Sequence, residues 1–144
     1  MEKQMIGNIL WKVLPYGTLV AGKVFGTVPD TIIVPETVGG IQVKALGAKF
    51  LEDANGNVTE VILPETLEEI GEKAFAKFKC KKVVLPRRMK RIGEAAFIGA
   101  QINEVVFPDK LDFIAEYAFY RSNINEPTQL LKTVYSVGLN AFSP

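Results

Sequence analysis

The densest run of charge in the sequence is basic and lies within fifteen residues. It contains eight basic side chains and no acidic one: Lys77, Lys79, Lys81, Lys82, Arg87, Arg88, Lys90 and Arg91. Closely spaced Lys and Arg bind phosphate groups through charge attraction and counterion release. The run is therefore a candidate polyanion-binding segment, which would engage nucleic acid or a nucleic-acid-binding site. The alternative is that its charges wrap around one turn of a repeating structure and face acidic residues on neighbouring turns.

Residue types that commonly carry catalysis are scarce. The chain of 144 residues has no histidine and one cysteine, Cys80, so it lacks the commonest general base and metal ligand and an internal disulfide framework. Carboxylate pairs such as Glu68 and Glu69, or Asp112 and Glu116, could serve a glycosidase, but they fall on repeated surface positions. We expect no enzymatic activity, no cofactor and no metal, and we interpret Cys80 as a small buried hydrophobe.

One polar segment, residues 53–57, has the oxygen spacing that begins a calcium-binding loop. Its sixth position is Val58 instead of glycine, and the coordinating glutamate is absent from the twelfth position. We interpret Asn55-Gly56 as an Asn-Gly turn.

The strongest pattern in the sequence is an internal repeat. Three apolar triplets are each followed by a proline, at Pro64, Pro86 and Pro108, with a spacing of 22 residues. Each copy continues with an aliphatic and small pair and then an Ala-Phe pair, and a fourth Ala-Phe pair stands at residues 141–142. A unit this short cannot bury its apolar side chains alone, so neighbouring units must stack into one core. The repeat predicts a β-rich solenoid with a short strand before each proline.

We expect one domain over residues 1–144, with an N-terminal cap (1–30), repeats (31–126) and a C-terminal capping repeat (127–144). The phenylalanines of the Ala-Phe pairs should stack as an aromatic column. Outward charges should alternate in sign between neighbouring coils, as Glu60, Lys82 and Glu104 do. Residues 125–129 replace the strand expected in the last unit, and we interpret them as protection of the sheet edge.

Two groups of outward positions are candidates for contact with a partner. The first is an apolar stripe on the predicted strands, made of Ile33, Ile62, Val84 and Val106. Such a stripe can bind a partner, although β-branched residues also suit exposed strand positions. The second group is aromatic and belongs to the last coils: Phe113, Tyr117 and Tyr135. Clustered aromatics are typical of an interaction hot spot, and the alternatives are closure of the C-terminal end or a dimer contact.

The pattern Leu-x-x-Ile-Gly-x-x-Ala-Phe followed by Leu-x-x-Val-x-Leu-Pro resembles the BspA-type leucine-rich repeat over residues 31–144. Residues 11–35, with the Gly-Gly pair at 39–40, resemble the β-hairpin cap and first half-repeat of that family. The resemblance implies protein-protein or adhesive binding, usually on bacterial or protozoan surfaces. The cysteine that often follows the Ala-Phe pair is replaced by Phe78, Ala100 and Ser122. The family's usual signal peptide is also missing, so the chain as given would be cytoplasmic.

The overall charge is nearly balanced. Seventeen Lys and Arg against sixteen Asp and Glu leave a net charge of +1, which gives no general attraction to nucleic acid or to acidic membranes. No apolar run approaches the length of about 18 residues that a membrane span requires. We expect a protein partner in preference to nucleic acid, no membrane insertion, and a monomer or weak dimer. An intracellular inhibitor or decoy acting through residues 77–91 is the alternative function, and a structural spacer from a longer adhesin is a third.

Overall fold

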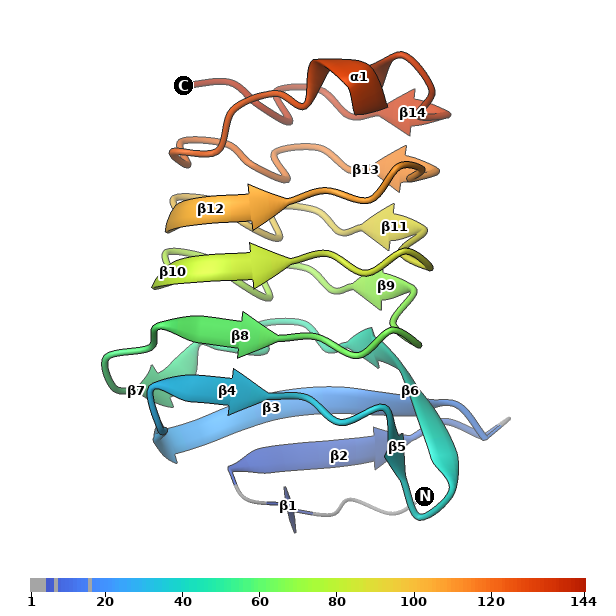
Figure 1. Cartoon of the computed structure of the whole chain (residues 1–144), viewed down its shortest axis with the longest axis vertical. Coiled ribbons are helices and arrows are strands. Elements are labelled where there is room, and N and C mark those ends of the chain that lie inside the picture. Colours follow the sequence, from blue (N-terminus) through green and yellow to red (C-terminus); the bar gives the residue numbers. More distant parts are fainter. Residues whose placement is uncertain (1–4, 7, 16) are drawn as a thin grey trace.

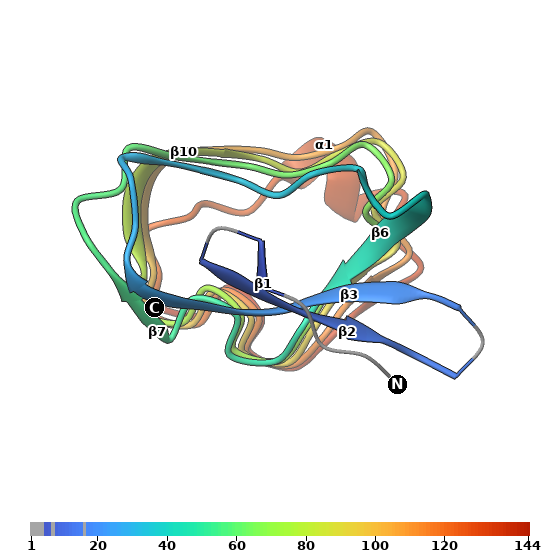
Figure 2. The same ribbon diagram turned by 90° about the horizontal axis from the view of Figure 1, so that it is seen from below.

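The structure, a computed structural model, describes residues 5–6, 8–15 and 17–144. These residues form a β-solenoid whose coils stack along the long axis, from the N-terminal end at the bottom of Figure 1 to the C-terminal end at the top. Each regular coil gives one strand to a front sheet and, after a corner, a shorter strand to a second sheet (Figures 1 and 2). The predicted β-rich solenoid is confirmed.

The front sheet contains four parallel strands in the order β12, β10, β8, β4. Their bounds are Thr31–Ile33 for β4, Glu60–Ile62 for β8, Lys79–Val84 for β10 and Gln101–Val106 for β12. Val83 pairs with Val61 on one side and with Val105 on the other, so the sequence repeat of 22 residues is also the strand register. The strands predicted before the repeat prolines are therefore confirmed. Each proline follows its strand, where its missing N–H breaks no ladder bond.

The second sheet contains strands too short to be recognised from their pattern. Its two-residue strands are β9 (Glu69–Ile70), β11 (Arg91–Ile92), β13 (Phe113–Ile114) and β14 (Ser136–Val137). They pair in parallel and align Ile70, Ile92 and Ile114, which are buried in the core. The sheet continues through β6 (Ile41–Leu46) to β3 (Leu19–Thr27). The hydrogen bonds of this second sheet thus align neighbouring coils at the corner that follows each proline.

The predicted aromatic column runs through the core. The rings of Phe75, Phe97, Phe119 and Phe142 stack in sequence, with centroids 4.6, 4.9 and 4.8 Å apart and with their planes within 11° of parallel. The coils approach closely beside this column, since a Cβ built on Gly93 would lie 2.7 Å from the carbonyl oxygen of Ile70. This contact explains the small residue that ends each aliphatic pair.

At the N-terminal end, β2 (Ile9–Val13) pairs antiparallel with β3 and with β1 (Met5–Ile6). A second hairpin joins β5 (Thr37–Val38) to β6. Residues 1–4, 7 and 16 of the expected cap lie outside the described residues. The capping role of residues 1–30 and the extent of the domain stay predictions.

The C-terminal unit departs from the repeat. Residues 125–129 form no strand, as expected, and the chain makes the short helix α1 (Thr128–Leu131), which buries Leu130. β12 therefore remains the last strand of the front sheet. Among the residues that the structure describes, no helix has the length and apolar character needed to cross a membrane.

The Asn-Gly turn predicted at residues 55–56 is wrong. Asn55 ends a strand, β7 (Asp53–Asn55), which pairs in parallel with the end of β3. Gly56 has a φ of +143°, which is far from the type I′ turn of an Asn-Gly hairpin. This unit is long, with 29 residues from Pro35 to Pro64 against 22 from Pro64 to Pro86. The segment after β7 consequently bulges beyond the outline of the other coils, at the left of Figure 2.

Candidate functional site

The apolar stripe predicted on the front sheet is a continuous row in the structure. Ile33 lies beside Ile62, and Val84 beside Val106, while the pairing of Val83 with Val61 sets Val84 next to Ile62. The residues of the row are 61, 41, 40 and 38% exposed from Ile33 to Val106. Alternation along each strand turns these side chains outward and the preceding residues inward. Neighbouring strands lie about 4.8 Å apart, so the row is about 14 Å long.

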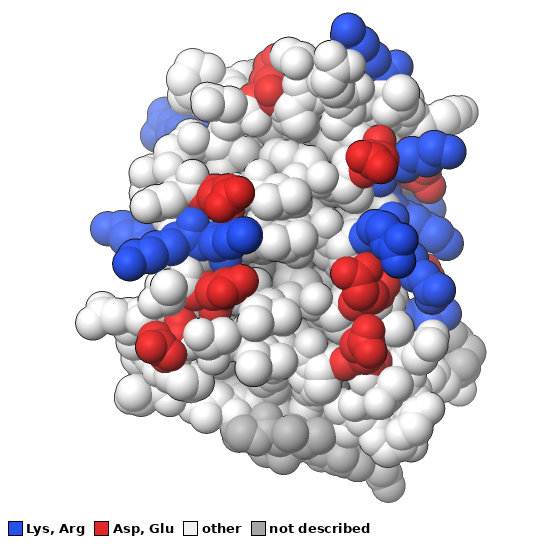
Figure 3. Space-filling model, in the orientation of Figure 1, with Lys and Arg blue, Asp and Glu red and all other residues white. Residues whose placement is uncertain are grey.

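Charged side chains flank this row on both sides. Glu60, Lys82 and Glu104 are paired across the front sheet two residues before the row. On the other side, Arg87 Nε lies 3.8 Å from Glu65 Oε2. Figure 3 shows the result, an uncharged strip between two groups of charges that alternate in sign. An apolar centre with a charged margin is the arrangement found in many protein interfaces.

The basic segment 77–91 is divided by the fold. Arg87, Lys90 and Arg91 face glutamates of the preceding coil, with Lys90 Nζ 3.5 Å from Glu68 Oε1 and Arg91 Nη1 3.5 Å from Glu69 Oε1. Lys82 lies on the front sheet between Glu60 and Glu104. The remaining residues, Lys77, Lys79, Lys81 and Arg88, are exposed and form no ion pair within the described residues. Because its charges spread around one coil and are partly neutralised, the segment forms no single basic face for nucleic acid.

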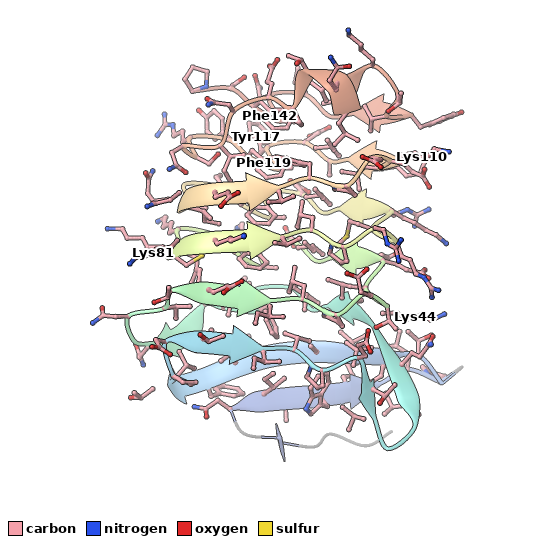
Figure 4. The ribbon with its side chains drawn as sticks, viewed as in Figure 1. Lys44, Lys81, Lys110, Tyr117, Phe119 and Phe142 are labelled. Carbon is pink, nitrogen blue, oxygen red and sulfur yellow. The ribbon has the colours of Figure 1, made fainter. Side chains whose placement is uncertain are left out.

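The C-terminal aromatics fall into two pairs. Phe113 and Tyr135 meet edge to face with centroids 5.5 Å apart, and the guanidinium of Arg91 lies 5.2 Å from the Phe113 ring centroid. Tyr135 is 83% exposed. Tyr117, labelled in Figure 4, pairs instead with Tyr120 at 5.1 Å. The structure therefore joins Phe113 with Tyr135 at the corner formed by β13 and β14, and sets Tyr117 in a separate pair.

Two basic residues that the sequence reasoning did not single out lie near the basic segment. Lys49 and Lys73 line a hollow together with Lys77 and Lys79. The backbone N–H of Lys49 bonds to the carbonyl of Glu72, next to Lys73, and that of Lys73 to the carbonyl of Glu94, so the two lysines hold equivalent places in successive coils. In the sequence, Lys49 and Lys73 each stand two residues after a glycine, Gly47 and Gly71. This equal spacing could have predicted that the two lysines occupy equivalent positions.

Cys80 is buried at the position that Ile102 takes in the next coil, so the expectation of a buried hydrophobe is confirmed. Desolvation raises the pKa of the Cys80 thiol to about 11, against an ordinary value of 9.0, although a weak contact with the carbonyl of Lys82 opposes the rise.

The raised pKa of Cys80 predicts a loss of stability in alkali. Between about pH 9 and pH 11 the unfolded chain releases the thiol proton and the folded chain keeps it, so the unfolded state binds fewer protons and stability falls as pH rises. Valine is the residue at position 58 in the preceding unit, so Cys80→Val is a suitable variant. We expect its urea midpoint to fall less steeply between pH 8 and pH 10 than that of the wild type. If the urea midpoints of the wild type and Cys80→Val fell equally with pH, the raised pKa of Cys80 would not be the cause of the alkaline loss of stability.

A solenoid of stacked coils, with parallel strands, an exposed apolar row and columns of charge, defines a repeat protein. The chain belongs to the family described as BspA type Leucine rich repeat region, whose profile matches residues 31–144 in six copies.

Comparison with solved structures found several similar chains. The pneumococcal vaccine antigen PcpA is 19% identical with a TM-score of 0.56, over 99% of this chain and 47% of that chain. A leucine rich cell surface protein from Faecalibacterium prausnitzii is 18% identical with a TM-score of 0.44, over 99% of this chain and 52% of that one. A leucine-rich repeat protein from Bacteroides capillosus is 19% identical with a TM-score of 0.48, over 93% and 97%. This chain thus spans about half the length of the first two. Comparison with curated proteins found no match.

Proposed function

We propose that this chain is a non-enzymatic module that binds another protein through the front sheet, with the row formed by Ile33, Ile62, Val84 and Val106 as the centre of the contact. The observation that carries the proposal is the exposure of four aliphatic side chains in one unbroken register. The adhesive role implied by the family supports it.

The size of the row indicates how a partner would be held. A typical interface covers about 800 Å² on each partner, and a row about 14 Å long supplies only its centre. The flanking charges, including Lys82 and Arg87, would form the margin that excludes water and selects a partner of complementary sign. Phe113 and Tyr135 form a second contact, beside the charge column that ends at Arg91.

The test introduces positive charges at the apolar row and compares the result with a matched control. The double variant Ile62→Lys with Val84→Lys introduces two charges at the centre of the row. The control, Ile41→Lys with Leu139→Lys, makes the same change at two exposed aliphatic residues outside the row. We expect proteins captured from cell-surface extracts by the wild type to be lost from the first variant and kept by the control.

A second variant tests the aromatic contact. Phe113→Ala with Tyr135→Ala should weaken the same capture, because aromatic side chains at interfaces often contribute about 2 kcal/mol or more. If both double variants keep the wild-type set of partners, the proposed surface is wrong. Recovery of nucleic acid that disappears at high salt would instead support the alternative based on residues 77–91.

A further inference from the structure

The hollow beside β7 is a product of the irregular first unit. β7 pairs with the end of β3, and the segment after it bulges beyond the outline of the other coils (Figure 2), whereas the next coil follows the regular path. The step between them leaves a space of about 650 Å³. It is bounded by the β7 segment, which includes Ala54, and by the turn that carries Ala76 and Phe78. The volume is within the range of small-ligand sites, about 300 to 1,000 Å³.

Four exposed lysines line this space: Lys49, Lys73, Lys77 and Lys79. None of the four forms an ion pair among the described residues. The acidic side chain in the lining is Glu52, whose carboxylate lies 3.4 Å from the Lys23 ammonium group and is therefore already paired. The hollow consequently has an excess of positive charge in a protein with a net charge of only +1.

Two of these lysines stack on one another with the same sign. At the corner of the second sheet, by contrast, aligned residues carry opposite charges, as Glu69 and Arg91 do. Here Lys49 and Lys73 hold equivalent places in successive coils, about 4.8 Å apart along the stack. A bound anion would supply the counter-charge that neither lysine has among the described residues. The same turn brings Lys77 to the hollow from the coil of Lys73.

Apolar side chains complete the lining and indicate the kind of anion. Ala54, Phe78 and Ile98 also line the hollow and give it carbon surface. Sugar rings have apolar C–H faces and carry sulfate or carboxylate groups at their edges, which matches both parts of the lining. Nucleic acid bases need an open aromatic face, but Phe78 is half-buried and its ring meets Phe75 edge to face at 6.1 Å. We propose that this hollow binds an acidic oligosaccharide, held by Lys49, Lys73, Lys77 and Lys79.

The site can be tested without disturbing the fold. Lys73 and Lys77 have φ values of +56° and +58°, a region that favours glycine and asparagine, and Gly99 takes the place of Lys77 in the next coil. The variant Lys73→Asn with Lys77→Gly therefore removes two charges while suiting the backbone, and its unfolding midpoint should be no lower than that of the wild type. The matched control is Arg88→Asn with Lys110→Asn, which removes two charges outside the hollow.

The measurement is calorimetric titration at low salt with a heparin-derived hexasaccharide. We expect binding by the wild type and the control, and affinity weaker by about tenfold or more in Lys73→Asn with Lys77→Gly, because two of the four positive charges at the site are removed. An unsulfated uronic acid oligomer distinguishes which acid group is recognised. Failure to bind either sugar, equal affinity in both variants, or equally tight binding of tripolyphosphate or single-stranded DNA would overturn the proposal. The result is independent of the front sheet, because Ile62→Lys with Val84→Lys leaves this hollow intact.

Discussion

Phe97→Ala is expected to lower the free energy of unfolding by about 3–5 kcal/mol. Phe97 is completely buried and stacks on Phe75 below and Phe119 above, at 4.6 and 4.9 Å. Alanine at this position removes the ring from both stacking contacts and leaves a cavity between two coils that cannot close, because backbone hydrogen bonds fix their separation. Urea denaturation followed by far-ultraviolet circular dichroism measures the loss.

Phe142→Ala is the control for this prediction. Phe142 is half-buried at the end of the column, and among the described residues its ring stacks only on that of Phe119. We expect about half the loss seen at Phe97, because less surface is buried and water can fill the space. Equal losses of unfolding free energy in Phe97→Ala and Phe142→Ala would contradict this prediction. They would show that a ring stacked on both sides contributes no more to stability than a ring at the end of the column.

The regular coils could be predicted from the sequence because each position recurs with the same neighbours. The spacing of Pro64, Pro86 and Pro108 gave the register of β8, β10 and β12, and alternation along these strands turned Ile62 and Val84 outward. In the regular coils each residue contacts the equivalent residues 22 positions before and after it. The contacts between coils therefore follow from the repeat length.

The irregular first unit could not be predicted in the same way. β7 pairs with β3 about 28 residues earlier, and the sequence of Asn55-Gly56 favours a local turn that the long-range pairing overrides. The Ala-Phe pair is also replaced in this unit by Phe50-Leu51, since Phe50 stands three residues after Gly47 as Ala74 stands three after Gly71. The backbone N–H of Leu51 makes the bond to Ala74 that Phe75 makes to Ala96, so Leu51 takes the place of the first phenylalanine.

The candidate surfaces on the regular coils could also be predicted from the sequence, whereas the one beside the irregular first unit could not. The exposure of the apolar row was predictable, because a period of two fixes which strand residues face outward. The division of the basic segment also followed from the repeat, since Arg87, Lys90 and Arg91 align with glutamates one unit earlier. The gathering of Lys49 with Lys77 and Lys79 depends on the bulge at β7, and no pattern in a single unit indicates it.

Trp11→Ala tests whether the N-terminal hairpin folds together with the solenoid. Trp11 lies on β2 and is 1% exposed, and its strand partner Ala21 pairs in turn with Leu46 of β6. Trp11 thus belongs to the same apolar core as the coils. We expect Trp11→Ala to lower the free energy of unfolding by about 3–5 kcal/mol, which is the usual loss for a buried tryptophan. Circular dichroism in urea monitors the sheets, which lie mostly outside the hairpin.

Trp11→Phe is the matched control, because the indole N–H of Trp11 is buried with no hydrogen-bond partner among the described residues. Phenylalanine keeps most of the ring and removes that unsatisfied donor, so we expect a change within about 1.5 kcal/mol. Trp11 is also the only tryptophan of the chain, and its fluorescence in the wild type reports on the hairpin alone. Coincident unfolding curves by fluorescence and circular dichroism would show one cooperative unit. An earlier fluorescence transition, with the circular dichroism midpoint of Trp11→Ala unchanged, would mean that the solenoid is stable without this hairpin and that residues 1–30 do not cap it.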